Sequence, residues 1–109
     1  MNDLENRFDK EMMNIYRRAL AECGYNAHFF HQMLTERRGL QTAKDLLHAP
    51  VPQEGFYTLW KLNRHDLTVE TLVLCDPWNQ LFTADELAEA QKRLQDYGYL
   101  TPPKTNQNL

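Results

Sequence analysis

His28 and His31 come closest, among the residues of this sequence, to the spacing of a chemical site. Three positions apart on a helix, the two imidazoles would share one face and could hold a metal ion if a third ligand came from elsewhere. The sequence offers no second spaced pair, such as a CxxC or HExxH motif, to complete the site. Two surface or helix-capping histidines are the simpler interpretation, so we predict no metal site and no cofactor.

Covalent catalysis would need a nucleophile beside a base, and the sequence contains no serine. Cys23 with a histidine is the one thiol–imidazole pairing worth naming, and no glycine-rich turn supports it. We interpret Cys23 and Cys75 as reduced thiols in apolar helical segments, because neither belongs to a metal-binding motif. The neighbouring carboxylates Asp85 and Glu86 are explained by helix capping. The sequence therefore predicts that the protein is not an enzyme.

Residues 26–48 invite comparison with a helix-turn-helix DNA reader, because two short helices are expected on either side of Gly39. Aligning Gly39 with the usual turn glycine puts Asp45 where the second helix needs an apolar residue. A plain corner between two helices is therefore favoured, and a small DNA-binding regulator is the alternative. Its candidate nucleic-acid-binding residues are the basic and amide side chains near the turn, Arg37, Arg38, Gln41 and Lys44.

Aromatic and basic residues gather in the second half of the sequence, around Trp60, Arg64 and Trp78. Aromatic side chains beside arginine are typical of protein interfaces and of surfaces that stack on bases, but they also build the cores of small domains. We expect Trp60 and Trp78 in the core, with Arg64 and His65 exposed. The candidate partner-binding residues are Arg64, His65, Tyr97 and Tyr99.

Helical periodicity predicts the elements that must position these residues. Apolar residues recur on one face from Leu4 to Leu20, and Gly24 supplies the left-handed residue that closes many helices. Asn26 is expected to cap a second helix, which buries Phe29 and ends at Gly39. Three shorter helices are expected over 42–48, after Gly55 and over 68–75. The last of these is rich in β-branched residues, but an isolated strand would have no partner.

The final helix, from about Thr83 to Tyr97, carries the strongest local signal. Thr83 and Glu86 have the spacing of a capping box, in which each side chain bonds the other residue's main-chain N–H. Phe82 and Leu87 have the spacing of a hydrophobic staple across the same helix start. Gly98 is placed to end the helix.

The composition, 42% hydrophobic and 25% charged in 109 residues, is that of one ordinary globular domain. We expect a helical domain over 1–100 and a polar tail over 101–109. The formal charge of −3 is spread evenly, which lowers the expectation of nucleic acid binding. No apolar run approaches the ~20 residues that a bilayer requires, and residues 1–11 are too charged for a signal peptide. We therefore expect a cytoplasmic protein that does not bind membranes.

Several short motifs follow one another in a specific order and spacing: Ile15-Tyr16-Arg17-Arg18-Ala19, Cys23-Gly24-Tyr25-Asn26, Gly55-Phe56, Asp66-Leu67-Thr68-Val69-Glu70, Leu81-Phe82-Thr83 and Tyr97-Gly98-Tyr99. Over about Leu4 to Tyr99, this string resembles a group of small bacterial proteins and appended domains with no assigned function. The resemblance implies a bacterial or phage origin and a loose association with genome-defence or mobile-element genes. It implies no catalytic residues.

Together these observations predict an all-α, compact single-domain bundle of five or six helices, in which long first and last helices clasp shorter ones. Because every conspicuous polar motif has a structural role, we expect a non-enzymatic interaction module. Such a module would bind another macromolecule, more readily a protein than a nucleic acid, through an aromatic and basic surface.

Overall fold

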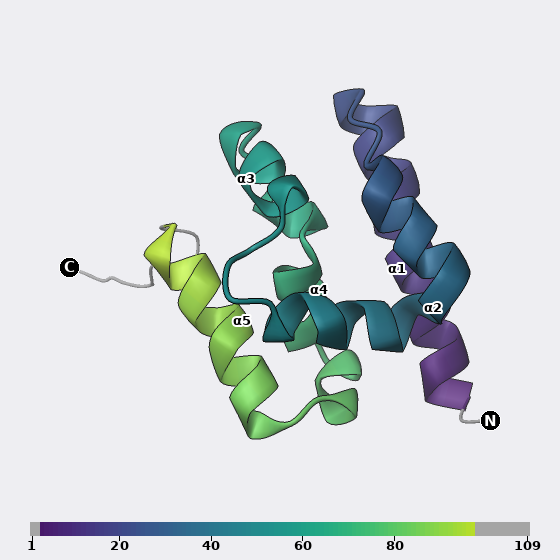
Figure 1. Cartoon of the computed structure of the whole chain (residues 1–109), viewed down its shortest axis with the longest axis vertical. Helices are drawn as coiled ribbons and strands as arrows, with labels where there is room; N and C mark the ends of the chain where they lie inside the picture. Colours follow the sequence, from purple (N-terminus) through teal and green to yellow (C-terminus); the bar gives the residue numbers. More distant parts are fainter. Residues whose placement is uncertain (1–2, 98–109) are drawn as a thin grey trace.

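Residues 3–97 are described in the computed structural model of the chain, and within that range only helices and loops occur (Figure 1). The elements are α1 Asp3–Cys23, α2 His28–His48, α3 Glu54–Lys61, α4 Val69–Leu74 and α5 Ala84–Asp96, with short 3-10 helices η1 His65–Leu67 and η2 Trp78–Leu81. The predicted all-α bundle is confirmed, and α4 occupies the most strand-like stretch. The expected tail over 101–109 lies outside the described residues, as do Gly98 and Tyr99.

α1 and the beginning of α2 form a helical hairpin (Figure 1). Gly24 adopts a φ of +66° and its N–H donates to the Leu20 carbonyl at 3.0 Å, which ends α1 as predicted. The expected cap Asn26 has a different role. Ala27 occupies the capping position without a side-chain bond, while the Asn26 side chain accepts a hydrogen bond from the Tyr16 hydroxyl at 2.9 Å. Asn26 thus fastens the loop to α1.

α2 bends at Arg38 into a first arm (residues 28–37) and a second arm (residues 39–48) that runs across the bundle (Figure 1). Arg38 has φ 67° and ψ 177°, a backbone region that is essentially restricted to glycine. The next residue, Gly39, allows α2 to pack closely against α1, because a Cβ there would lie 2.8 Å from the Asp9 Cα. Asp9 Oδ1 accepts from the Gly39 N–H at 2.7 Å and so caps the second arm from α1. The break predicted at Gly39 therefore falls one residue earlier.

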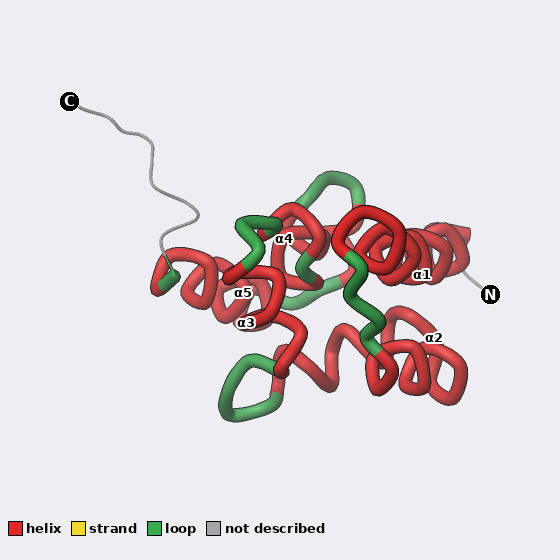
Figure 2. The backbone as a smooth tube through the Cα atoms, turned by 90° about the horizontal axis from the view of Figure 1, so that it is seen from above, coloured by secondary structure: helices red, strands yellow, loops and turns green. Residues whose placement is uncertain are grey.

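The core lies where α4 sits between α1 and α5, as both ribbon views show (Figure 1, Figure 2). Its largest cluster draws on all three of these helices and on both arms of α2: Phe8, Met12, Ile15, Phe30, Leu34, Ala43, Leu46, Leu47, Val69, Val73, Phe82 and Ala90. Trp78 is half-buried against Phe8, with ring centroids 5.8 Å apart. Two residues expected in the core are not there, since Phe29 is 77% exposed and Trp60 38%.

Arg93 carries its charge into this interior and is only 3% exposed. Its guanidinium makes five hydrogen bonds, to the carboxylates of Glu70 and Glu89 and to the main-chain carbonyls of Leu46, Leu47 and Ala49. The carbonyls belong to the C-terminal end of α2, where such groups lack partners within the helix and attract positive charge. Arg93 therefore joins α2, α4 and α5.

Substitutions at the bend of α2 should act in opposite directions. Arg38→Gly relieves the strained backbone, and we expect it to raise the free energy of unfolding by about 1 kcal/mol. Gly39→Ala forces a methyl group against α1 and should lower it by ~1–3 kcal/mol. Denaturant titration of both variants measures these changes. A destabilised Arg38→Gly protein would show that the hydrogen bonds of Arg38 to Asn6 and Asp9 outweigh the strain.

Candidate protein-binding surface

Four aromatic rings meet where α3 passes the end of α5, and we call Phe56, Tyr57, Trp60 and Tyr97 the aromatic cluster. The ring of Tyr97 is 5.3 Å from Phe56, 5.5 Å from Tyr57 and 5.1 Å from Trp60, measured between centroids. All three pairs meet edge to face, which is a favoured arrangement for aromatic side chains. The neighbouring side chain of Tyr57 raises the pKa of Tyr97. The rings therefore hold one another in place.

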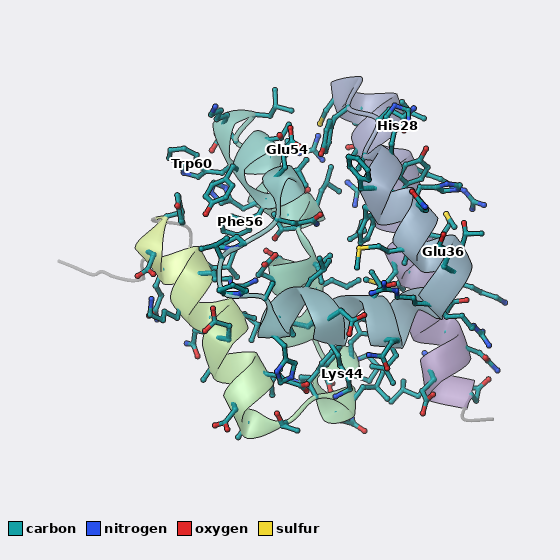
Figure 3. The ribbon with its side chains drawn as sticks, in the orientation of Figure 1. His28, Glu36, Lys44, Glu54, Phe56 and Trp60 are labelled. Carbon is teal, nitrogen blue, oxygen red and sulfur yellow. The ribbon has the colours of Figure 1, made fainter. Side chains whose placement is uncertain are left out.

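One side of the aromatic cluster is buried in the protein and the other is exposed to solvent. Phe56 is 1% exposed, whereas Trp60 is 38% exposed. Figure 3 shows Phe56 directed toward the interior near α5 and Trp60 at the outer edge of α3. A large apolar side chain on a rigid base can bind a partner with little loss of conformational entropy.

Of the predicted partner-binding residues, Tyr97 belongs to the cluster and Tyr99 lies outside the described residues. Arg64 pairs with Glu22 at 2.6 Å and with Asp66 at 3.0 Å, and these hydrogen bonds raise its pKa. Arg64 thereby ties the loop after α3 to the end of α1. His65 was expected at the surface, but it is 8% exposed, and this burial lowers its pKa. The predicted surface is thus aromatic rather than aromatic and basic.

The four predicted nucleic-acid-binding residues all line one groove of about 260 Å³ between α1 and the bend of α2. Each of them bonds an acidic side chain of the protein itself: Arg37 and Gln41 bond Asp45 at 2.8 Å, Arg38 bonds Asp9 at 3.3 Å, and Lys44 bonds Glu86 at 2.7 Å. Glu5 also lines the groove. These carboxylates offset the positive charge that a phosphate backbone would need.

Glu86 links this groove to the start of α5. Burial raises the pKa of its carboxylate, but hydrogen bonds from Lys44, the Thr83 N–H and His48 outweigh it and lower the pKa to about 2. The predicted capping box with Thr83 is confirmed. The contacts with Lys44 and His48, at 2.7 and 2.8 Å, were not foreseen, because they join residues far apart in the sequence.

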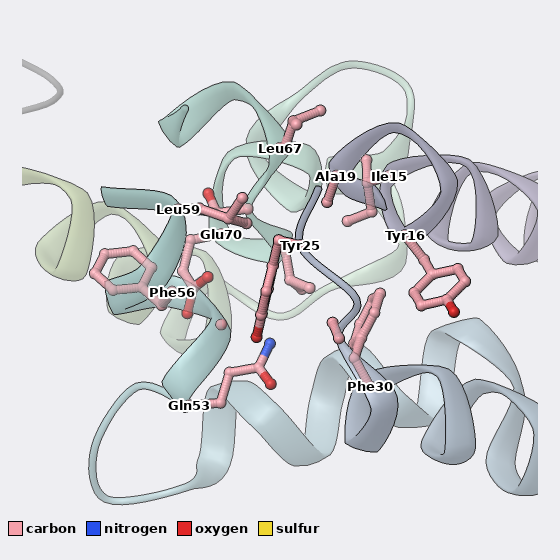
Figure 4. Close-up of a pocket in the computed structure, with 14 residues that line it drawn as sticks. Ile15, Tyr16, Ala19, Tyr25, Phe30, Gln53, Phe56, Leu59, Leu67 and Glu70 are labelled. Atoms are coloured by element: carbon pink, nitrogen blue, oxygen red, sulfur yellow. The ribbon is translucent and has the colours of Figure 1, made fainter. Parts of the chain in front are cut away.

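An internal cavity among α1, α3 and α4 offers little room for chemistry. It holds about 20 Å³ and is lined by Tyr25, Gln53, Glu70 and apolar side chains (Figure 4). That is the space of one water molecule. The Glu70 carboxylate is 3.1 Å from Arg93, and burial raises its pKa. Within residues 3–97, no group of three His, Cys, Asp or Glu side chains could hold a metal ion.

Comparison with known proteins gave no match among family models, curated proteins or solved structures. The family resemblance drawn from the motifs therefore stays a prediction. None of the helices described over 3–97 combines the length and apolar character that crossing a membrane requires.

The pKa of Glu86 makes its contribution to stability dependent on pH. Because folding lowers this pKa from 4.5 to about 2, the stabilisation is complete above pH 4.5 and is lost as the pH falls toward 2. We expect Glu86→Gln to lower the free energy of unfolding by ~1–3 kcal/mol at pH 7, and the difference from wild type to shrink below pH 4.5.

Urea titration between pH 7 and pH 2 measures this difference, and the exposed neighbour Asp85, changed to Asn, is the matched control. A difference for Glu86→Gln that stayed constant over this pH range would contradict the assignment.

Proposed function

We propose that the protein is a non-enzymatic interaction module that binds another protein through the aromatic cluster. The observation that carries the proposal is the exposure of Trp60 in a group of rings that meet edge to face and whose inner member, Phe56, is buried. Interface hot spots are enriched in tryptophan and tyrosine and depend on well-packed surroundings. The motif resemblance suggests a bacterial or phage accessory protein as the setting.

The polar side chains support a role without catalysis. Two buried charged side chains have structural roles, Arg93 with helix carbonyls and Glu86 with the cap of α5. Turnover of a nucleotide or nucleic acid by the purified protein, abolished by a single His or Cys substitution, would refute this part of the proposal.

Trp60→Ala tests the binding surface. With the tagged protein as bait in its native host, we expect the variant to lose at least ~10-fold of the captured partner, since a central tryptophan contributes ~2 kcal/mol or more to binding. Quantitative mass spectrometry of the captured proteins measures this loss.

The matched control is Leu20→Ala, because Leu20 is also apolar and 41% exposed but lies on α1. Its capture should equal that of wild type, and thermal denaturation should show all variants folded. If Trp60→Ala also captures the partner at the wild-type level, the aromatic cluster is not the interface.

The alternative function is a small DNA-binding regulator, and one observation favours it: Arg37, Arg38, Gln41 and Lys44 share a groove at the bend of α2. This function predicts a complex with duplex DNA at low salt that weakens about tenfold or more when Arg37 and Lys44 are both changed to Ala. Arg17→Ala, at an exposed basic residue of α1, is the control. A gel shift at about 50 mM salt that shows no complex removes this alternative.

A further inference from the structure

The bend of α2 puts its unfavourable backbone angles on Arg38 rather than on the adjacent glycine. Arg38 holds a φ of 67°, although Gly39, the next residue, could adopt such an angle at little cost. The residues on either side, Glu36-Arg37 and Leu40-Gln41, are strong helix formers. Local preference therefore favours an α2 that continues straight through residue 38, and the bend is imposed by contacts with the rest of the chain.

These contacts join two lobes on either side of the bend. The N-terminal lobe is α1 with the first arm of α2 (residues 3–37), and the C-terminal lobe is the second arm with everything that follows it (residues 39–97). Five of the twelve residues in the largest core cluster belong to the N-terminal lobe, and seven belong to the C-terminal lobe. Arg64 of the C-terminal lobe also pairs with Glu22 of the N-terminal lobe at 2.6 Å.

A single chain cannot straighten α2 without loss of this shared core. The second arm runs across the direction of the first (Figure 1), so a straight α2 would carry the N-terminal lobe away from the C-terminal lobe. The apolar side chains that the lobes bury against each other would then be exposed to water, at a cost far above the strain of one residue. The monomer therefore keeps the bend.

A second copy of the chain removes this obstacle. If two chains exchange lobes, the N-terminal lobe of each packs on the C-terminal lobe of the other, and the same core contacts form between the chains. Each α2 can then be straight. The Gly39 N–H, which Asp9 caps in the bent form, would donate to the Thr35 carbonyl as in any α-helix. The bent and exchanged forms thus share their core and differ at the bend.

We infer that the protein forms a domain-swapped dimer with Arg38 as its hinge, in which α2 is one continuous helix and each lobe is covered by the complementary lobe of the second copy. The dimer relieves two strained residues, but it loses two Asp9 caps and the translational freedom of one chain. It is therefore weak and accumulates when the chain folds at high concentration. Trp60 has no part in the exchange, so the inference is independent of the proposed function.

Refolding of the full chain from urea at about 1 µM and at about 1 mM, followed by sedimentation velocity, tests the inference, because this range spans weak dimerisation. Wild type should be monomeric at the lower concentration and contain dimer at the higher one. Arg38→Gly relieves the bend and weakens the straight helix, so it should raise the dissociation constant at least ~10-fold. The exposed pair of Arg38 with Asp9, at 3.3 Å, contributes little to either form.

Asp9→Ala should act in the opposite direction. It removes a cap that only the bent form uses, and it should lower the dissociation constant at least ~5-fold. Asp3→Ala, at an exposed carboxylate of the same helix, is the control and should dimerise like wild type.

A cross-link distinguishes lobe exchange from the association of intact monomers. In Arg64→Lys, a carbodiimide can couple the introduced amine to the neighbouring Glu22 carboxylate. In a swapped dimer this bond joins two chains, and the denatured protein runs as a dimer on a gel. In a dimer of intact monomers the bond stays within one chain. Wild type is the matched control, because arginine does not react, and mass spectrometry of the peptides identifies the bond.

Three results would each overturn the inference. The first is a wild-type protein that stays monomeric after refolding at the higher concentration. The second is a dimer in which the bond to Glu22 lies within one chain. The third is an Arg38→Gly protein, expected to fold at least as well as wild type, that dimerises as strongly as wild type does.

Discussion

The buried guanidinium of Arg93 is the interaction on which the rest of the fold depends. An unpaired charge in a protein interior is strongly destabilising, and four of the five hydrogen bonds of Arg93 reach outside α5, one to Glu70 of α4 and three to carbonyls at the end of α2. The same contacts hold the C-terminal end of α2, after which the chain turns into α3. The position of α3, and hence of the aromatic cluster, follows from this arrangement.

Helix boundaries could be predicted where one residue type dictates local geometry. Gly24 ends α1, and Thr83 with Glu86 forms the capping box of α5. Long-range pairings could not be predicted. Nothing near Arg93 in the sequence indicates that the carbonyls of α2 will surround it. The sequence therefore predicts an exposed arginine at this helix position, whereas the structure buries it. The same reason explains why the cap of the second arm, Asp9, was missed.

The candidate site was predicted in part. Tyr97 was named from its place at the end of the last helix, but its contacts with Trp60 and Tyr57 depend on how α3 and α5 meet. Trp60 was expected in the core because tryptophan usually lies there. α3 has only eight residues and buries Phe56 and Leu59, which leaves the indole of Trp60 at the edge. Arg64 and His65 were placed at the surface by sequence, but Arg64 bonds Glu22 at the end of α1 and His65 is buried.

Because of the contact between Asp9 and Gly39, the two arms of α2 depend on different parts of the chain. Its first arm pairs with the adjacent helix across a short loop, whereas its second arm begins on a carboxylate 30 residues earlier in the chain. Closing a loop of that length has an entropic cost that the local hydrogen bonds of one helix do not offset. The second arm is therefore a product of tertiary assembly rather than a segment that forms by itself. Contiguous helical residues here do not make a single folding unit.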